Sequence, residues 1–272
     1  MLRARLKRKA EQLELPGHLG PGEIAKLVNS SRTAVSAAIH RHALDYYIGQ
    51  KPEKDGRVRI NLKDFSFALR RANPTFDSQV YALQEELNIK ADALETTRQR
   101  IVRAAERCGA VEPFTVTQCA DILNISRKLL TKTLKAHQPR LVTFDLCPVL
   151  TRGPMPMVWS DELALFTCRT NQPLPKSKVS DSTIRCLDWI KGTLVCCASR
   201  HGIREPYTIY DVMRILKISK QRVTRPLSNG EAPLIAFDVG TGSRRIWRIW
   251  NDDLSWHLML GNRDRWRDVD GH

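Results

Sequence analysis

The sequence predicts a mainly α-helical protein with small β-hairpins, an α+β fold class, built from three tandem copies of one unit. Three observations predict it: a motif that occurs three times without gaps, a helix-start signal before each copy, and a strand–turn–strand pattern after each copy. With 272 residues, of which 42% are hydrophobic, the chain is long enough to bury several small cores. Length alone suggests about two domains, so the repeat is more informative than the length.

The repeated motif aligns on three serines, Ser31, Ser126 and Ser219, which are 95 and 93 positions apart. A basic residue follows each serine, and apolar residues stand three and four positions before it and four and eight positions after it. Apolar residues at these spacings predict two short amphipathic helices joined by a tight turn that ends at the serine. The matching windows are residues 24–39, 119–134 and 212–227.

A helix-start signal precedes each window. A threonine whose side chain caps the first turn, with an acid or amide three residues later, is a capping box or a close relative of one. The second and third copies have this arrangement, and the first copy has a Gly-Pro start followed by an acid. The residues are Thr115 with Gln118, Thr208 with Asp211, and Gly20-Pro21 with Glu23.

Runs of β-prone residues around glycine-containing turns follow each window and predict hairpins. Each hairpin is followed by a short helix with an expected cap at Asn61, Ser160 or Asn251. A longer helix is expected before each window. These longer helices are expected over residues 2–13, 95–108 and 182–199, and the hairpins over residues 44–60, 141–159 and 234–250.

These elements divide the chain into three domains with two connecting segments. The first connection is an acidic bridging helix, because Val80, Leu83 and Leu87 recur at helical spacing among acidic residues. The second is rich in Pro, Ser and Lys and is typical of a linker. The expected boundaries are 1–75 for the first domain, 76–94 for the bridging helix, 95–170 for the second domain, 171–181 for the linker, 182–260 for the third domain and 261–272 for a charged tail.

The unit resembles the winged helix-turn-helix superfamily of DNA-binding domains, here in three tandem copies. The resemblance implies that one helix braces each domain, that the next two form the helix-turn-helix, and that the hairpin is the wing. It also implies that the helix after each serine enters the major groove of DNA. The chain departs from the family pattern in the turn, where the position that is commonly glycine holds Asn29, Asn124 and Lys217. It departs again at Pro226, which is expected to shorten or kink the third recognition helix.

The helix after each serine is expected to bury one apolar stripe and to present its opposite face to DNA. Hydroxyl side chains together with Arg, Lys or Gln can bond both base edges and phosphates, and basic residues of the hairpins are expected to contact phosphates. The candidate DNA-binding residues are Ser31, Arg32, Thr33, Ser36, His40, Lys54 and Arg57 in the first copy, Ser126, Arg127, Lys128, Thr131, Lys132 and Lys135 in the second, and Ser219, Lys220, Gln221, Arg222, Thr224, Arg225, Arg244 and Arg245 in the third.

The charge balance agrees with this interpretation. The chain has 44 Lys and Arg against 29 Asp and Glu, a net charge of +15, which favours a polyanionic partner. The placement of the charge on helices and hairpins indicates double-stranded DNA. We therefore expect a sequence-specific DNA-binding protein, either a transcriptional regulator or a binder of a replication or partition origin. The expected location is the cytoplasm, with nucleoid association in a bacterial or phage protein.

Two other functions stay open at the level of the sequence. One is a protein-interaction scaffold of winged-helix units with only non-specific affinity for nucleic acid, in which the acidic helix over residues 77–95 contacts a protein partner or a second copy of the chain. The other is binding of structured RNA, which the lack of aromatic base-stacking motifs disfavours.

No motif of a catalytic or cofactor site is present, so the sequence predicts neither an enzyme nor a cofactor. It contains no phosphate-binding loop, no dinucleotide-binding glycine motif and no zinc-protease motif. The seven cysteines are scattered without a C-x-x-C pair, which indicates reduced thiols and no metal site. No apolar run approaches the ~18 residues of a membrane span, so no membrane partner is expected.

Overall fold

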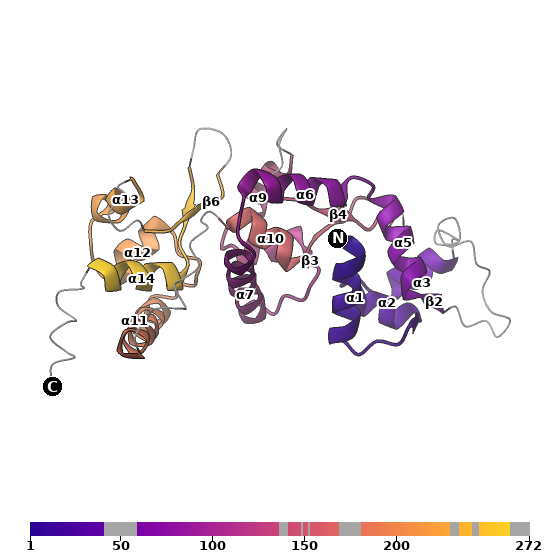
Figure 1. Cartoon of the computed structure of the whole chain (residues 1–272), viewed down its shortest axis with the longest axis horizontal. Helices are drawn as coiled ribbons and strands as arrows, with labels where there is room; N and C mark the ends of the chain where they lie inside the picture. Colours follow the sequence, from indigo (N-terminus) through magenta and orange to yellow (C-terminus); the bar gives the residue numbers. More distant parts are fainter. Residues whose placement is uncertain are drawn as a thin grey trace. The chain divides into compact units, whose positions relative to one another are not determined.

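The computed structural model describes residues 1–40, 59–135, 141–147, 149–151, 153–168, 181–228, 234–240 and 245–261. Within these ranges, thirteen helices and short antiparallel strands make up the fold (Figure 1). The coarse prediction of a mainly helical protein with small β-structure is confirmed.

Among its described residues, the first copy of the motif forms four helices and one small two-stranded sheet. Its elements are α1 (Leu2–Gln12), β1 (His18–Leu19), α2 (Pro21–Leu27), α3 (Arg32–His40), β2 (Ile60–Asn61) and α5 (Leu62–Ala72). Strand β2 pairs antiparallel with β1, with Leu19 opposite Ile60. The Asn61 side chain caps α5 by accepting a hydrogen bond from the Lys63 N–H at 2.8 Å. The expected hairpin over residues 44–60 lies outside the described residues apart from its last two positions.

The second copy has the same order of elements with a three-stranded sheet. Its elements are α7 (Ala91–Arg107), β3 (Phe114–Thr115), α8 (Val116–Ile122), α9 (Arg127–Leu134), β4 (Phe144–Asp145), β5 (Pro156–Val158) and α10 (Ser160–Thr167). The strand order is β3-β5-β4, with Phe114 opposite Val158 and Phe144 opposite Met157. The strands β4 and β5 lie within the hairpin predicted over residues 141–159.

The segment between the first two copies forms a shorter helix than the apolar spacing predicts. Helix α6 (Phe76–Leu87) ends where Asn88 takes a left-handed conformation with φ 45°, and α7 begins at Ala91. Asn is one of the few residues that adopts this conformation at a helix C-terminus at little cost. Residues 76–94, expected as one helix, therefore belong to two helices. The sequence did not indicate the break at Asn88, because the apolar spacing continues across it.

The third copy repeats the arrangement after the longest helix. Its elements are α11 (Asp181–Arg200), α12 (Ile209–Leu216), α13 (Lys220–Ser228), β6 (Phe237–Asp238), β7 (Trp247–Arg248) and α14 (Asn251–Gly261). Strands β6 and β7 pair antiparallel within the predicted hairpin, and Tyr207 bridges to Ile249. Pro226 lies inside α13, which has nine residues, the same length as α3. The helix continues for two residues past Pro226, to Ser228.

The turns between the paired helices have a left-handed backbone at all three positions where the sequence departs from the glycine of the family pattern. Asn29, Asn124 and Lys217 have φ values of 50°, 52° and 53°. The Thr208–Asp211 capping box is also present, with the two reciprocal hydrogen bonds at 2.9 and 3.0 Å. The three windows thus share backbone conformation at the turn as well as sequence.

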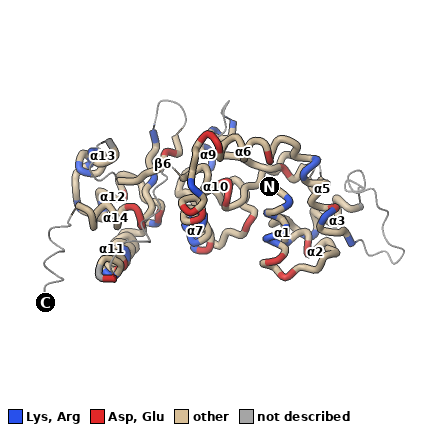
Figure 2. The backbone as a smooth tube through the Cα atoms, in the orientation of Figure 1, with Lys and Arg blue, Asp and Glu red and all other residues tan. Residues whose placement is uncertain are grey.

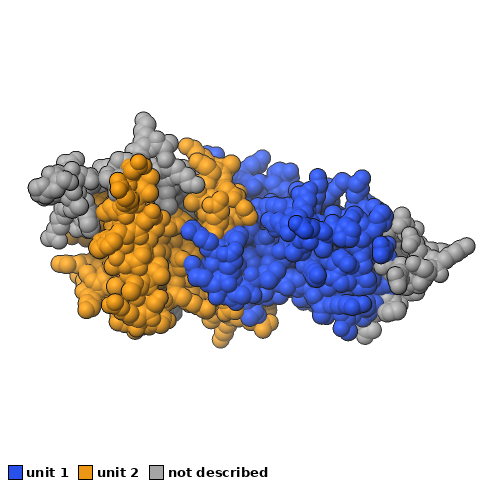
Figure 3. All heavy atoms as spheres, turned by 90° about the horizontal axis from the view of Figure 1, so that it is seen from below, with its two compact units in different colours: residues 1–88, 101–119, 138–166 blue, residues 89–100, 120–137, 167–272 orange. Residues whose placement is uncertain are grey.

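The contacts of the chain divide it into two compact units (Figure 3). One contains residues 1–88, 101–119 and 138–166, and the other contains residues 89–100, 120–137 and 167–272. The division passes through α7, α8 and the last residue of α10, all of which belong to the second copy. Each unit therefore combines an outer copy of the motif with parts of the middle copy.

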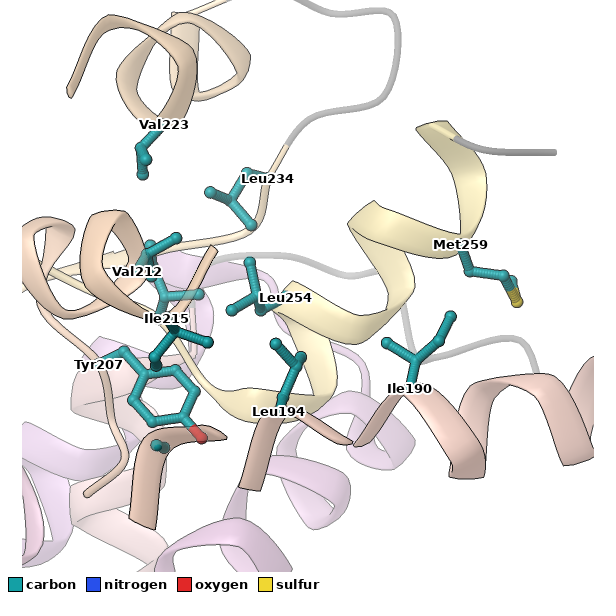
Figure 4. Packing of buried hydrophobic residues seen from close by; sticks show 11 residues of the cluster. Ile190, Leu194, Tyr207, Val212, Ile215, Val223, Leu234, Leu254 and Met259 are labelled. Atoms are coloured by element: carbon teal, nitrogen blue, oxygen red, sulfur yellow. The ribbon is translucent and has the colours of Figure 1, made fainter. Parts of the chain in front are cut away.

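Each unit has its own aromatic and aliphatic core. In the first, the Phe144 ring stacks on Trp159 with centroids 5.6 Å apart, and in the second, Phe237 stacks on Trp250 at the same separation. A cluster of buried side chains in the second unit joins α11, α12, α13 and α14, as Leu254 and its neighbours show (Figure 4). The two stacked pairs occupy equivalent hairpin positions, so the hairpins are anchored to their domains in the same way.

Candidate nucleic-acid interface

Helix α9 presents a basic face opposite its buried side. The Ser126 side chain caps the first turn, accepting a hydrogen bond from the Leu129 N–H at 3.3 Å. Leu130 and Thr133 on the inner side are buried, and Thr131 is half-buried. The exposed residues on the outer side are Ser126, Arg127, Lys128, Lys132 and Lys135.

Helix α3 has the same plan with fewer charges. The Ser31 hydroxyl oxygen accepts a hydrogen bond from the Ala34 N–H at 3.1 Å, and Val35 and Ala38 are fully buried. Ile39, expected to be buried, is half-buried. The outer face carries exposed Ser31, Arg32 and Thr33 and half-buried Ser36. His40 is the last residue of the helix, and its side chain lies outside the described part of the structure.

Helix α13 carries the densest set of exposed polar groups. Val223 is buried against the core, and the exposed residues are Ser219, Lys220, Gln221, Arg222 and Arg225. The Thr224 hydroxyl, expected to face DNA, donates a hydrogen bond to the Lys220 carbonyl of its own helix at 3.1 Å. The Lys220 ammonium lies 5.8 Å from the centroid of the exposed Tyr210 ring. This contact holds the first cation of α13 beside α12.

None of the three helices contains an acidic residue. Their sequences are RTAVSAAIH, RKLLTKTL and KQRVTRPLS. A solvated helix face in an ordinary domain mixes charges of both signs, so the absence of Asp and Glu from all three is a shared electrostatic property. Figure 2 shows the basic residues along α13.

The hairpin residues divide between described and undescribed parts of the chain. Lys54, Arg57 and Arg244 lie outside the described residues. Arg245 is exposed, and its guanidinium lies 5.5 Å from the centroid of the Trp247 ring, which is half-buried. Arg245 is thus held at the base of the third hairpin by a cation–π contact.

An aspartate that the sequence did not single out shapes two of the hairpins. The Asp145 carboxylate accepts hydrogen bonds from the Cys147 and Met155 N–H groups at 2.9 and 2.8 Å. Asp238, 93 positions later, accepts bonds from the Gly240 and Ile246 N–H groups in the same manner. Both aspartates could have been found in the sequence, because each follows a phenylalanine at the equivalent position of its hairpin.

Comparison with known proteins adds no assignment. No family model, no curated protein and no solved structure matches this chain. Among the described residues, no helix meets the length and hydrophobicity needed to cross a membrane, and no group of His, Cys, Asp and Glu is arranged to hold a metal ion.

Proposed function

We propose that this protein binds double-stranded DNA in a sequence-specific manner, using α3, α9 and α13 as tandem recognition helices in three winged helix-turn-helix domains and the hairpins as wings. Its role is that of a transcriptional regulator or of a protein that binds a replication or partition origin. The observation that supports the proposal best is the repeated outer face of these helices. Each follows a left-handed turn, is free of acids, and exposes at least one cation together with hydroxyl or amide groups.

The chemistry of that face matches the chemistry of duplex DNA. Arg and Lys bind guanine edges and phosphates, and Gln and short hydroxyl groups bind adenine edges or phosphates. Three such helices in one chain would contact one asymmetric site, and their linkage raises the effective concentration of each. A modest affinity of the single domains is therefore compatible with a stable complex.

The test is competition binding of the full chain against random duplex DNA at two salt concentrations. We expect one sequence, selected from a random pool, to displace the probe at concentrations where random duplex does not. The double variant Arg127→Ala with Lys128→Ala should weaken binding about 10- to 100-fold, because each lost contact to a base or phosphate is worth roughly 1–3 kcal/mol. It should also reduce the dependence of affinity on salt, because fewer counterions are released.

A matched control removes the same charge from another helix. Arg3 and Lys7 are exposed on α1, and replacing both by Ala leaves the proposed interface intact. If the α1 variant and the α9 variant lose affinity equally, or if no sequence outcompetes random duplex, the proposal of specific recognition is wrong.

A scaffold function has one observation in its favour. Helix α6 exposes Tyr81 with 55% of its surface accessible, next to exposed Glu85 and Glu86. An aromatic side chain among acids on an exposed helix is a surface that a basic protein partner fits. This alternative predicts weak DNA binding that does not depend on sequence, so the same competition assay separates the two functions.

A further inference from the structure

An arginine at the same position of the first helix makes the same contact in the first two copies. Arg5 in α1 and Arg100 in α7 are 95 positions apart, which is the spacing of the aligned serines. The Arg5 guanidinium pairs with Asp161 at 2.9 Å and Glu162 at 2.7 Å, at the start of α10 in the second copy. Arg5 and Glu162 retain 13% and 0% side-chain exposure. The first copy is thus joined to the second by a nearly buried ion pair.

The equivalent pair joins the second copy to the third. The Arg100 guanidinium binds both carboxylate oxygens of Asp253 at 3.0 Å and one oxygen of Asp252 at 3.2 Å, at the start of α14. Arg100 retains 9% side-chain exposure and Asp253 4%. Because α10 and α14 follow the hairpins of successive copies, the same arginine of one copy contacts the same helix of the next.

The turn asparagines make a second contact of this kind. The Asn29 side-chain amide donates hydrogen bonds to the Val111 and Pro113 carbonyls at 2.8 and 3.1 Å. The Asn124 amide donates to the carbonyls of the equivalent residues in the third copy: Arg204 at 3.2 Å and Pro206 at 3.3 Å. The backbone oxygen of Asn124 also accepts hydrogen bonds from the Arg248 guanidinium, the shorter at 2.8 Å.

These contacts explain why the turn holds asparagine. A left-handed turn is satisfied by glycine at least as well as by asparagine. Only asparagine adds an amide that reaches the neighbouring loop. The residue in the turn is therefore set by the contact with the next copy as well as by the local backbone.

We propose that these contacts form one head-to-tail junction, used twice within the chain, and that residues of the first and third copies keep a second copy of the chain from extending the series. An interface that joins different surfaces of successive units, and does not close into a ring, continues into a filament unless it is capped. Among the described residues, the donor position of the third copy and the acceptor position of the first copy take part in neither junction.

The third copy lacks the donor residues of the junction, and the first copy has an additional cation in its acceptor helix. In the third copy, Thr193 stands where Arg5 and Arg100 stand, and Lys217 takes the place of the turn asparagine; both are exposed. In the first copy, exposed Lys63 is the second residue of α5, where α10 and α14 have Asp161 and Asp252, and half-buried Asp64 follows it, where they have Glu162 and Asp253. The third copy thus has neither the arginine nor the amide, and the first copy keeps one acid, Asp64, but has Lys63 in place of the second acid.

The first test examines the junction within the chain. Asn124→Gly keeps the left-handed turn but removes the amide, and Lys217→Gly makes the same change at the position where no junction exists. In the Asn124 variant, amide hydrogen exchange of the full-length protein should become about tenfold faster or more over residues 204–208. In the Lys217 variant, exchange should change only within the turn that contains residue 217. Equal local effects of the two variants would overturn the junction.

The second test restores the donor and acceptor positions separately. Thr193→Arg with Lys217→Asn rebuilds the donor surface, and Lys63→Asp rebuilds the acceptor surface. Mixed in equal amounts, these two variants should associate at least about tenfold more tightly than wild type with wild type in sedimentation velocity. Each variant alone should behave as wild type does. If the mixture sediments like wild type, these residues do not cap the series and that part of the proposal is wrong.

Discussion

Replacing Arg100 by Met leaves the buried carboxylate of Asp253 without its ion-pair partner. This variant therefore tests whether the ion pair stabilises the second unit. Asp253 is 4% exposed, and both of its oxygens bind Arg100. Methionine retains most of the arginine stem but no charge, so the variant mainly removes the partner of Asp253. Asp252, which also binds Arg100, retains its contact with Lys191 at 3.2 Å.

The expected loss of stability is about 3–5 kcal/mol at neutral pH, the usual cost of breaking a buried pair by removing one partner. The double variant Arg100→Met with Asp253→Leu should recover most of that loss, because an apolar pair of similar volume avoids the desolvation of both charges. Arg98→Met in the same helix is the control. Arg98 pairs with Glu95, which is 47% exposed, and exposed pairs contribute about 0–1 kcal/mol.

The assay is urea unfolding followed by tryptophan fluorescence, since Trp250 is buried in the same unit as Arg100 and Asp253. The free energies of unfolding of the three variants are compared with wild type at pH 7. If Arg100→Met costs no more than Arg98→Met, the Arg100–Asp253 pair does not stabilise the unit, and the reasoning from its burial is refuted.

Three further predictions concern pH, the core and the hairpins. Burial raises the pKa of Glu162 to about 7 and that of Asp253 to about 6, against the opposing effect of the facing arginines. The stability that these raised pKa values contribute is therefore complete below pH ~4 and is lost as pH rises to ~7, so the urea midpoint should fall over this range. Urea midpoints that rise over this range in wild type but not in Asp253→Asn would contradict this prediction. Trp159→Ala removes a fully buried ring and should cost about 3–5 kcal/mol in urea unfolding; a loss below about 1 kcal/mol would show that the ring is not packed as described. Asp238→Ala removes two hydrogen bonds to the turn and should increase amide exchange at Gly240 and Ile246, whereas unchanged exchange would mean that the carboxylate does not hold the hairpin.

Local signals in the sequence predicted the repeated elements well. The apolar spacing around Ser126 and the Thr208–Asp211 capping box both reflect interactions between residues within one or two helical turns. Such local interactions can be predicted from the sequence. The same signals failed at the acidic segment, where one continuous apolar spacing covers two helices separated by Asn88. The spacing of apolar residues predicts which face of a helix is buried, but it does not predict the residue at which the helix ends.

The contacts of the candidate interface were only partly predictable. The exposed faces of α9 and α13 follow from the amphipathic pattern, because the residues opposite a buried stripe are exposed. The bond from Thr224 to the Lys220 carbonyl and the ring contact of Lys220 with Tyr210 depend on rotamers and on packing between α12 and α13. No sequence pattern distinguishes such an occupied hydroxyl from one that faces solvent.

By itself, the sequence determined the mainly helical class, the threefold repeat and the placement of acid-free cationic faces after Ser31, Ser126 and Ser219. Only the tertiary structure decided that Arg5 and Arg100, which look like two more cations of a basic chain, are buried partners of acids 157 and 153 positions away. The physical reason is that a helix face and its caps arise from neighbours a few residues apart. An ion pair between successive copies exists only after each copy has folded and two surfaces distant in the chain have been brought together.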